Sequence, residues 1–256
     1  WDTIFEASSY GEISCCVPEY RPDMLERRLD VIPSAIPGDF FATHYVAGSG
    51  ITLDWFMNTF VRQEGQSTKE MFANMEREMA NIKPGCDGVM AIGSLGGSSM
   101  PSDGVLRGMW MGYDWSHSKA HFYKALLESF TYDFTLCLQS IERLYPEYDI
   151  SDVKIIGGGA KSPVWTQMCA DVQNKQYSVL DREDVAMWGA SILAGNAIGV
   201  FGDLKQTAID HVKVMKEYKP DEAYGKKYHK YMELYKQYCV ELHDFYKRLQ
   251  ELAETE

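Results

Sequence analysis

Three consecutive glycines between an apolar run and a proline constrain this chain more than any other feature. The segment reads I-I-G-G-G-A-K-S-P-V-W from Ile155 to Trp165. The apolar residues 153–156 predict a strand, and Ser162 with Pro163 form a good N-cap and first-turn pair for a helix. Because glycine has no Cβ, the backbone between them can approach a ligand closely. The segment therefore predicts a strand–loop–helix unit whose helix start offers free N–H groups and a positive dipole end to a phosphate or nucleotide.

Two other interpretations of the glycine loop stay open at this point. The same residues are compatible with a tight turn that binds nothing. They also approach the dinucleotide-binding fingerprint, because Gly157, Gly159 and Ser162 are spaced as in G-x-G-x-x-G and Asp181 follows a predicted strand. Against the fingerprint, Ser162-Pro163 replaces the glycine that allows close helix packing. The loop also lies far from the start of the chain, after a long predicted helix.

Predicted strands and helices alternate along the rest of the chain. Apolar residues recur by steps of four and three between Tyr123 and Leu144, which predicts one long amphipathic helix. A tyrosine-rich stripe from Asp221 predicts a long C-terminal helix. We expect the stripe to pack on its own domain rather than to form an oligomer interface. The alternation predicts an α/β fold with strands near 11–18, 40–47, 89–95, 107–113 and 176–180, and helices near 51–61, 68–82, 184–198 and 203–213.

Charge and cysteine content exclude several classes of protein. The 256-residue chain has a formal net charge of −12, so it is a poor candidate for binding nucleic acid or an anionic membrane surface. No stretch has the length and apolarity of a membrane span. Six cysteines form no C-x-x-C pair, which predicts reduced thiols in a cytoplasmic protein. The chain opens on Trp1 without a methionine, which suggests that it was cut from something longer.

One pair of histidines has a spacing that metal ligands use. His117 and His121 lie at i and i+4, but no glutamate stands between them as in H-E-x-x-H and no third ligand is evident. We therefore interpret them as polar residues in the first turn of the long helix and predict no metal site.

Several segments, in the same order along the chain, resemble one known family. Gly157–Val172 (GGGAKSPVWTQMCADV) is similar to the adenosine-motif segment of the FGGY carbohydrate kinases, and Ala186–Phe201 resembles their next helix. Arg107–Ser129 resembles the segment that leads into their long helix. Pro33–Gly38 and Ala47–Trp55 also fit. The resemblance covers nearly the whole chain, and the xylulokinase-like branch is the nearest.

The resemblance implies the actin-like ATPase fold, in which two ribonuclease-H-like α/β domains enclose a cleft. Each domain has a mixed sheet flanked by helices, here with a long C-terminal helix. The first domain mostly holds the sugar and carries an aspartate base, and the second mostly holds ATP. Residues 1–256 match only the second domain, so the chain is predicted to be one nucleotide-binding domain that lacks the N-terminal sugar-binding domain. No catalytic residue is assigned within it.

The resemblance also implies which residues touch the nucleotide. Gly158, Gly159 and Ser162 are predicted to line the adenosine and α-phosphate site, and Gly50 to lie near the phosphates. The family usually has a Gly-Thr-Ser type of turn at the β- and γ-phosphates, where this chain reads F-E-A-S-S-Y-G-E-I. Ser9 is the predicted hydroxyl there. Glu6 is a departure from the family pattern, because a carboxylate beside a phosphate would be repulsive.

The implied activity is transfer of the ATP γ-phosphate to a sugar hydroxyl, with xylulose or a related ketose as the substrate and Mg²⁺ on the phosphates. The predicted partners are ATP or ADP and, through the missing domain, the sugar; a homodimer stays open. The chain alone is predicted to be inactive. A second hypothesis is a non-catalytic nucleotide-binding or scaffold module of the same fold. The altered first turn favours that module, and the intact glycine loop opposes it.

Overall fold

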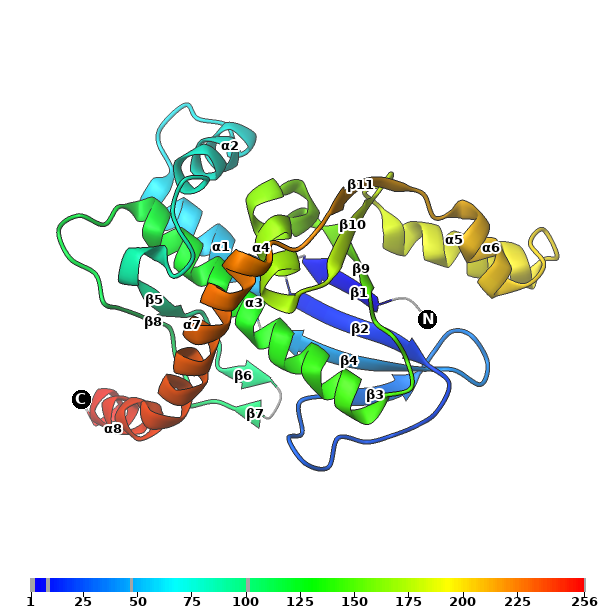
Figure 1. Ribbon diagram of the computed structural model, residues 1–256, viewed down its shortest axis with the longest axis horizontal. Coiled ribbons are helices and arrows are strands. Elements are labelled where there is room, and N and C mark those ends of the chain that lie inside the picture. The colour runs from blue at the N-terminus through cyan, green and yellow to red at the C-terminus, as the bar shows by residue number, and fades with distance from the viewer. Residues whose placement is uncertain (1–2, 8–9, 47, 100–101, 256) are drawn as a thin grey trace.

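A mixed β-sheet forms the centre of the protein (Figure 1). The computed structural model describes residues 3–7, 10–46, 48–99 and 102–255. Within them the main sheet has seven strands in the order β11-β10-β9-β1-β2-β4-β3. Their bounds are β1 (Thr3–Ala7), β2 (Gly11–Val17), β3 (Asp30–Pro33), β4 (Phe40–Val46), β9 (Asp152–Gly157), β10 (Gln176–Leu180) and β11 (Val214–Tyr218).

Strand directions bring four strand ends to the same side of the sheet. β1 pairs in parallel with β9, and β9 pairs in parallel with β10. β2 runs antiparallel to both β1 and β4, so β4 has the direction of β1. The carboxyl ends of β1, β4, β9 and β10 therefore share one edge, which we call the carboxyl edge. An antiparallel hairpin in the middle of the sheet does not occur in the doubly wound dinucleotide fold, so the fingerprint interpretation of the glycine loop is wrong.

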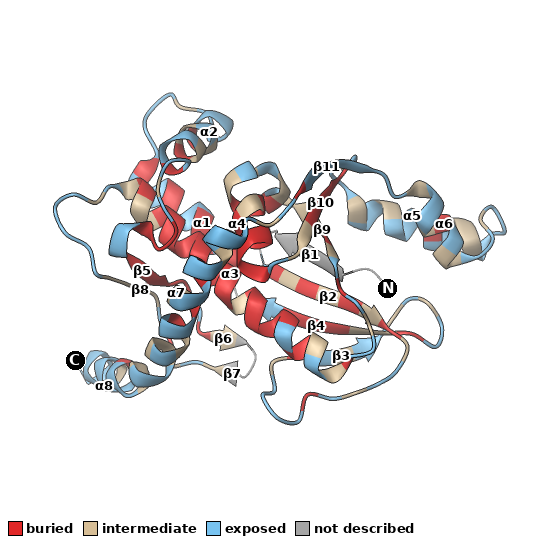
Figure 2. Cartoon of the chain, viewed as in Figure 1, coloured by how far each residue is buried: buried red, intermediate tan, exposed pale blue. Residues whose placement is uncertain are grey.

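The long helix α3 (Lys119–Leu144) is buried over most of its length, as Figure 2 shows. It packs against β2, β4 and β5 and against the helices α1, α2, α4 and α7. Three of its aromatic side chains, Phe130, Tyr132 and Phe134, are at most 1% exposed. The four-and-three periodicity predicted this helix. Because the helix is buried on almost all sides, its threonine and serine side chains bond back to its own backbone. Thr135 Oγ1, for example, donates to the carbonyl of Thr131 at 2.7 Å.

Two histidines, His117 and His121, lie at the start of α3. The backbone N–H of Ser118 donates to Nδ1 of His121 at 3.1 Å, and the two rings of His117 and His121 meet edge to face. Among the described residues, no group of three or more His, Cys, Asp or Glu side chains is placed to hold a metal ion. His121 therefore belongs to the first turn of α3, whereas His117 lies before the N-cap, where its Nδ1 accepts the N–H of Asp114 at 2.9 Å.

The remaining helices surround this core. α1 (Ser49–Phe56) continues directly into a π-helical turn, η1 (Met57–Val61), so the predicted helix 51–61 changes geometry midway. α2 (Thr68–Met79) starts at a capping box formed by Ser67 and Glu70. The others are η2 (Cys86–Gly88), η3 (Gly158–Lys161), α4 (Pro163–Gln173), α5 (Val185–Ala197), α6 (Leu204–His211), α7 (Glu222–Glu241) and α8 (His243–Glu254).

The predicted single C-terminal helix is wrong in one respect, because it breaks at Leu242 (φ −85°, ψ −6°). The break separates α7 from α8 and accompanies the burial of Tyr246, which is 3% exposed. The tyrosine stripe packs on its own domain, as predicted, with Tyr228 and Tyr235 buried. Tyr235 also donates to both carboxylate oxygens of Asp133 on α3, at 3.0 and 3.1 Å.

Sequence patterns missed several short strands. β1, β3 and β11 were not predicted, and neither were the small hairpin β6 (Ser98–Ser99) with β7 (Ser102–Asp103). The predicted strands 89–95 and 107–113 shorten to β5 (Met90–Ile92) and β8 (Met109–Met111), which pair with each other in a separate sheet. No helix in the described part of the chain is long and apolar enough to cross a membrane.

α5 and α6 extend from one end of the sheet (Figure 1). Although α5 is rich in apolar residues, Met187 is 70% exposed, and Ile198 just beyond its end is 78% exposed. Ile192 is the residue of α5 that reaches burial within the described structure. This unit therefore adds little to the core.

A turn of left-handed backbone precedes β5, and a buried carboxyl group fixes it. Gly85, Cys86, Asp87 and Gly88 all have positive φ, at 82°, 48°, 52° and 110°. Glu128 on α3 accepts the N–H of Gly85 at 3.0 Å. Since non-glycine residues rarely adopt such conformations, the surrounding structure must hold them in place. Burial raises the pKa of Glu128 to about 7, even though Lys124 and the hydrogen bond from Gly85 lower it.

The raised pKa of Glu128 predicts a stability that falls as pH rises. The folded protein keeps this carboxyl protonated above its ordinary value of 4.5, so its contribution is complete below pH 4.5 and is lost as pH rises through about 7. Glu128→Gln, which mimics the neutral acid, should match the wild type near pH 4.5 and exceed its unfolding free energy by on the order of 3 kcal/mol at pH 8. Urea unfolding at both pH values measures this difference. Glu142→Gln, on a partly exposed position of α3, is the control, and equal stabilities at pH 8 would contradict the assignment.

Candidate functional site

Three connections meet at the carboxyl edge of the sheet. β1 turns into β2, β4 leads into α1, and β9 leads into the glycine loop. The pairings Ala7↔Gly157 and Gly11↔Val46 place these connections side by side. The fold thus places the start of α1, with Gly50, at the same edge as the loop that holds Gly158 and Gly159, with the ends of β1 and β2 between them. Ser9 and the side chain of Glu6 lie outside the part of the chain that the structure describes, so the predicted phosphate turn stays a prediction.

The glycine loop is a single 3₁₀ turn between β9 and α4. Gly157 has φ 77° and ψ −161°, a conformation that favours glycine, and it reverses the chain out of the strand. The turn η3 follows, and Gly159 within it is buried. The N–H of Ser162 then donates back to the carbonyl of Gly159 at 3.0 Å. The loop is therefore compact and its end is tied to the residue that caps α4.

The N-terminus of α4 is closed, which corrects the prediction of free N–H groups there. Ser162 is the N-cap and accepts the N–H of Trp165 at 3.1 Å, as predicted from the Ser-Pro pair. Pro163 has no N–H to offer. The N–H of Val164 donates to the carboxylate of Glu76 at 2.7 Å, and the N–H of Thr166 donates to the carbonyl of Ser162 at 3.0 Å. Each donor of the first turn already has an acceptor.

Glu76 was not identified from the sequence. It lies on α2, and its carboxylate also accepts the hydroxyl of Ser162 at 2.8 Å. Burial raises the pKa of Glu76, while the hydrogen bonds from Val164 and Ser162 lower it. The contact joins positions that are 86 residues apart, and nothing in the local pattern of α2 distinguishes this glutamate from its neighbours. Ser162 stays a predicted nucleotide contact, but its hydroxyl is engaged within the protein.

The N-terminus of α1 is open where that of α4 is closed. Its N-cap is Gly48, with φ 77°, and no side chain caps the helix or places an acidic group in its first turn. The N–H of Thr52 bonds to the carbonyl of Gly48 at 2.8 Å. The structure gives no acceptor, among the described residues, to the N–H groups of Ser49, Gly50 and Ile51. Such a helix start is a ready site for an anion.

A buried hydroxyl lies beside this open helix start. Ser49 is fully buried, and its Oγ has no hydrogen-bond partner among the described residues. Gly11 at the start of β2 lies against it, since a Cβ there would be 2.6 Å from that Oγ and would collide with Phe134. The glycine is therefore required for the close approach of β2 and α1 at the carboxyl edge.

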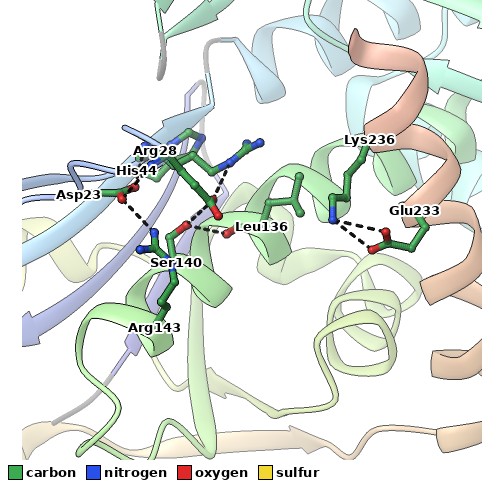
Figure 3. A network of polar contacts seen from close by, with 9 residues as sticks. Asp23, Arg28, His44, Leu136, Ser140, Arg143, Glu233 and Lys236 are labelled. Atoms are coloured by element: carbon green, nitrogen blue, oxygen red, sulfur yellow. Dashed lines mark hydrogen bonds and ion pairs between the residues drawn. The ribbon is translucent and has the colours of Figure 1, made fainter. Parts of the chain in front are cut away.

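A further cavity is lined by none of the predicted site residues, although Val46, at the carboxyl end of β4, belongs to its wall. Its volume is about 280 Å³, and it lies between β4, α3 and α7. Figure 3 shows the polar contacts of three residues that line it, Arg28, His44 and Lys236. Its charged groups have partners, with Arg28 3.2 Å from Glu26, Lys236 3.2 Å from Glu233 and Asp103 3.1 Å from His243. We therefore place the candidate site at the carboxyl edge and not in this cavity.

The sequence matches one family over most of its length. The family is the FGGY family of carbohydrate kinases, C-terminal domain, and the match spans residues 14–198. The chain is 28% identical over 217 residues to a xylulose kinase from Staphylococcus epidermidis. This match covers 83% of the chain and 42% of the relative. It is 30% identical over 200 residues to the xylulose kinase of Bacillus subtilis, which covers 77% of this chain and 38% of that protein.

Solved structures agree with this fold. A ligand-bound xylulose kinase from Lactobacillus acidophilus superimposes with a TM-score of 0.80 at 20% identity, covering 97% of this chain and 49% of that one. A xylulose kinase from Rhodospirillum rubrum gives 0.79 at 22% identity, covering 96% and 47%. The fold is thus the actin-like ATPase fold, as predicted, and the chain spans less than half the length of the relatives it matches. With most of its residues matched in order, the chain belongs to the FGGY family of carbohydrate kinases and corresponds to their C-terminal domain.

Proposed function

We propose that this chain is the ATP-binding half of a sugar kinase that transfers the γ-phosphate of ATP to a hydroxyl of xylulose or a related ketose. The observation that carries the proposal is the open N-terminus of α1, which lies at the same carboxyl edge of the sheet as the glycine loop. In open α/β sheets, ligands bind outside the carboxyl ends of the strands. A domain of a carbohydrate kinase with an anion site in that place is suited to hold the phosphates of a nucleotide.

The residues divide the nucleotide between two segments. Gly158, the exposed glycine of the turn, offers a backbone surface without a side chain, which suits the close approach of the adenosine, and the buried Gly159 stays a predicted contact. Gly50 and its neighbours offer N–H groups and the positive end of a helix dipole, which suit the phosphates. Ser9 is the candidate hydroxyl for the transferring end. The family resemblance supports this order of contacts along the nucleotide.

The chemistry of phosphoryl transfer fits a protein that supplies only half of the site. Such reactions depend on positioning and on neutralising charge, with a carboxylate that takes the proton of the attacking hydroxyl. We propose that residues 1–256 form one nucleotide-binding domain, and that the sugar-binding domain supplies the base and most sugar contacts. Xylulose is favoured because several relatives are named xylulose kinases; another, from Bacillus licheniformis, is named a gluconokinase and is 28% identical.

Mg²⁺ is compatible with this arrangement. The described residues include no cluster of three or more His, Cys, Asp or Glu side chains that would form a dedicated cage. Mg²⁺ does not need one, since it usually keeps several waters and binds through substrate phosphates with one or two carboxylates. When bound, it would neutralise charge on the phosphates, and the chain's own part is to orient those phosphates with the N–H groups of α1.

Placing a negative charge at the start of α1 should separate folding from nucleotide binding. Gly50→Glu puts a carboxylate in the first turn, where it favours the helix by about 0.3–1 kcal/mol but repels phosphate. The expected result is an unchanged or raised melting temperature together with ATP affinity about tenfold weaker than that of Gly50→Gln, the uncharged control. Calorimetric titration with ATP and thermal unfolding measure the two effects. Equal ATP affinity in the two variants would remove α1 from the phosphate site.

The division of the site between two domains predicts that the chain alone does not phosphorylate sugar. Purified residues 1–256 should release ADP from ATP at the same rate with and without xylulose, because the proposed base belongs to the sugar-binding domain. A longer version that includes the sugar-binding domain should show sugar-dependent release. A coupled ADP assay with a panel of ketoses makes the comparison. A longer protein that binds ATP but never responds to sugar would favour the scaffold hypothesis, and turnover by residues 1–256 would refute the proposed boundary.

A further inference from the structure

The carboxylate of Glu76 links a peripheral helix to the glycine loop. Glu76 extends from α2 to the first turn of α4, where Oε1 lies 2.7 Å from the N of Val164. Both of its oxygens lie within reach of the Ser162 hydroxyl, at 3.1 and 2.8 Å. A carboxylate that receives a backbone N–H and a hydroxyl at a helix N-terminus occupies the place in which such a terminus would otherwise hold a free anion.

This carboxylate depends on α4 for its stabilisation. Its neighbour on α2, Glu78, pairs with Lys119 at 3.4 Å, whereas Glu76 forms no ion pair within the described part of the chain. Glu76 is partly buried, so its charge is balanced by the two hydrogen bonds and the positive end of the α4 dipole. Removing the carboxylate would leave the N–H of Val164 and the hydroxyl of Ser162 without their acceptor.

Ser162 passes the constraint from Glu76 into the glycine loop. Its hydroxyl donates to Glu76 and accepts the N–H of Trp165, so the side chain is fixed from both sides. Its backbone N–H donates to the carbonyl of Gly159. A continuous chain of hydrogen bonds therefore runs from Glu76 through Ser162 to Gly159, the buried residue of the 3₁₀ turn.

We propose that Glu76 is a positioning residue for nucleotide binding. It holds the glycine loop in the form that receives the adenosine. By filling the start of α4 with its own carboxylate, it also leaves α1 as the helix start that is free to receive phosphate. The nucleotide part of this inference rests on the proposed function, whereas the fixing of the loop does not.

The test removes the carboxylate of Glu76 by mutation and supplies a small carboxylate, acetate, in solution. Glu76→Ala should raise hydrogen–deuterium exchange in residues 155–165, lower the melting temperature and weaken ATP binding about tenfold. Sodium acetate, compared with sodium chloride at equal concentration, should reverse all three changes, because acetate fits the vacated place against Val164 and Ser162. Glu78→Ala, one half-turn further along the same helix, should show no acetate response.

The possible outcomes separate positioning from simple stabilisation. Glu76→Gln keeps an acceptor for Val164 and should retain most of the ATP affinity with no response to acetate, and it serves if Glu76→Ala does not fold. A lower melting temperature with unchanged ATP affinity and loop exchange would reduce Glu76 to a structural cap and overturn the proposal. If the wild type itself fails to bind ATP, the proposed function fails, while acetate-dependent exchange of residues 155–165 still decides whether Glu76 holds the loop.

Discussion

The parallel pairing of β1 with β9 is the constraint on which the candidate site depends. It joins residues near the start of the chain to residues beyond position 150, from Thr3↔Val153 to Ala7↔Gly157. Because the pairing is parallel, both strands end at one edge, and the loops that follow them must lie next to each other. The antiparallel pair β2 and β4 then brings α1 to the same place. A slip of this register would separate the glycine loop from α1.

Two helices, α1 and α4, start at this edge, and only one of them has capped N–H groups. Each has a positive dipole end and N–H groups without acceptors inside the helix. In α4 a serine and the distant carboxylate of Glu76 accept N–H groups of the first turn, and a proline has no N–H. The start of α4 therefore has no free donor for a ligand. In α1 a glycine in left-handed conformation replaces the capping side chain. Anion binding at helix starts thus depends on what the rest of the fold leaves vacant.

The sequence predicted the helices and the order of elements better than it predicted the site. Ser162-Pro163 located the start of α4 because capping is a local interaction, and the periodicity of α3 survived because its burial follows from it. β1 was missed because five residues give too short a pattern, and its pairing partner lies about 150 positions away. Glu76 could not be found for the same reason. The break at Leu242 depends on where Tyr246 finds room to be buried, which no local propensity specifies.

The exposed apolar surface of α5 has a consequence for how the molecule behaves in solution. Met187 and Ile198 present hydrocarbon to water at one end of the molecule, on a helix whose N-cap is Asp184. Attraction between such patches is driven by released water, and it weakens on cooling. Turbidity of a concentrated sample should therefore grow on warming, below the unfolding temperature, and clear again in the cold.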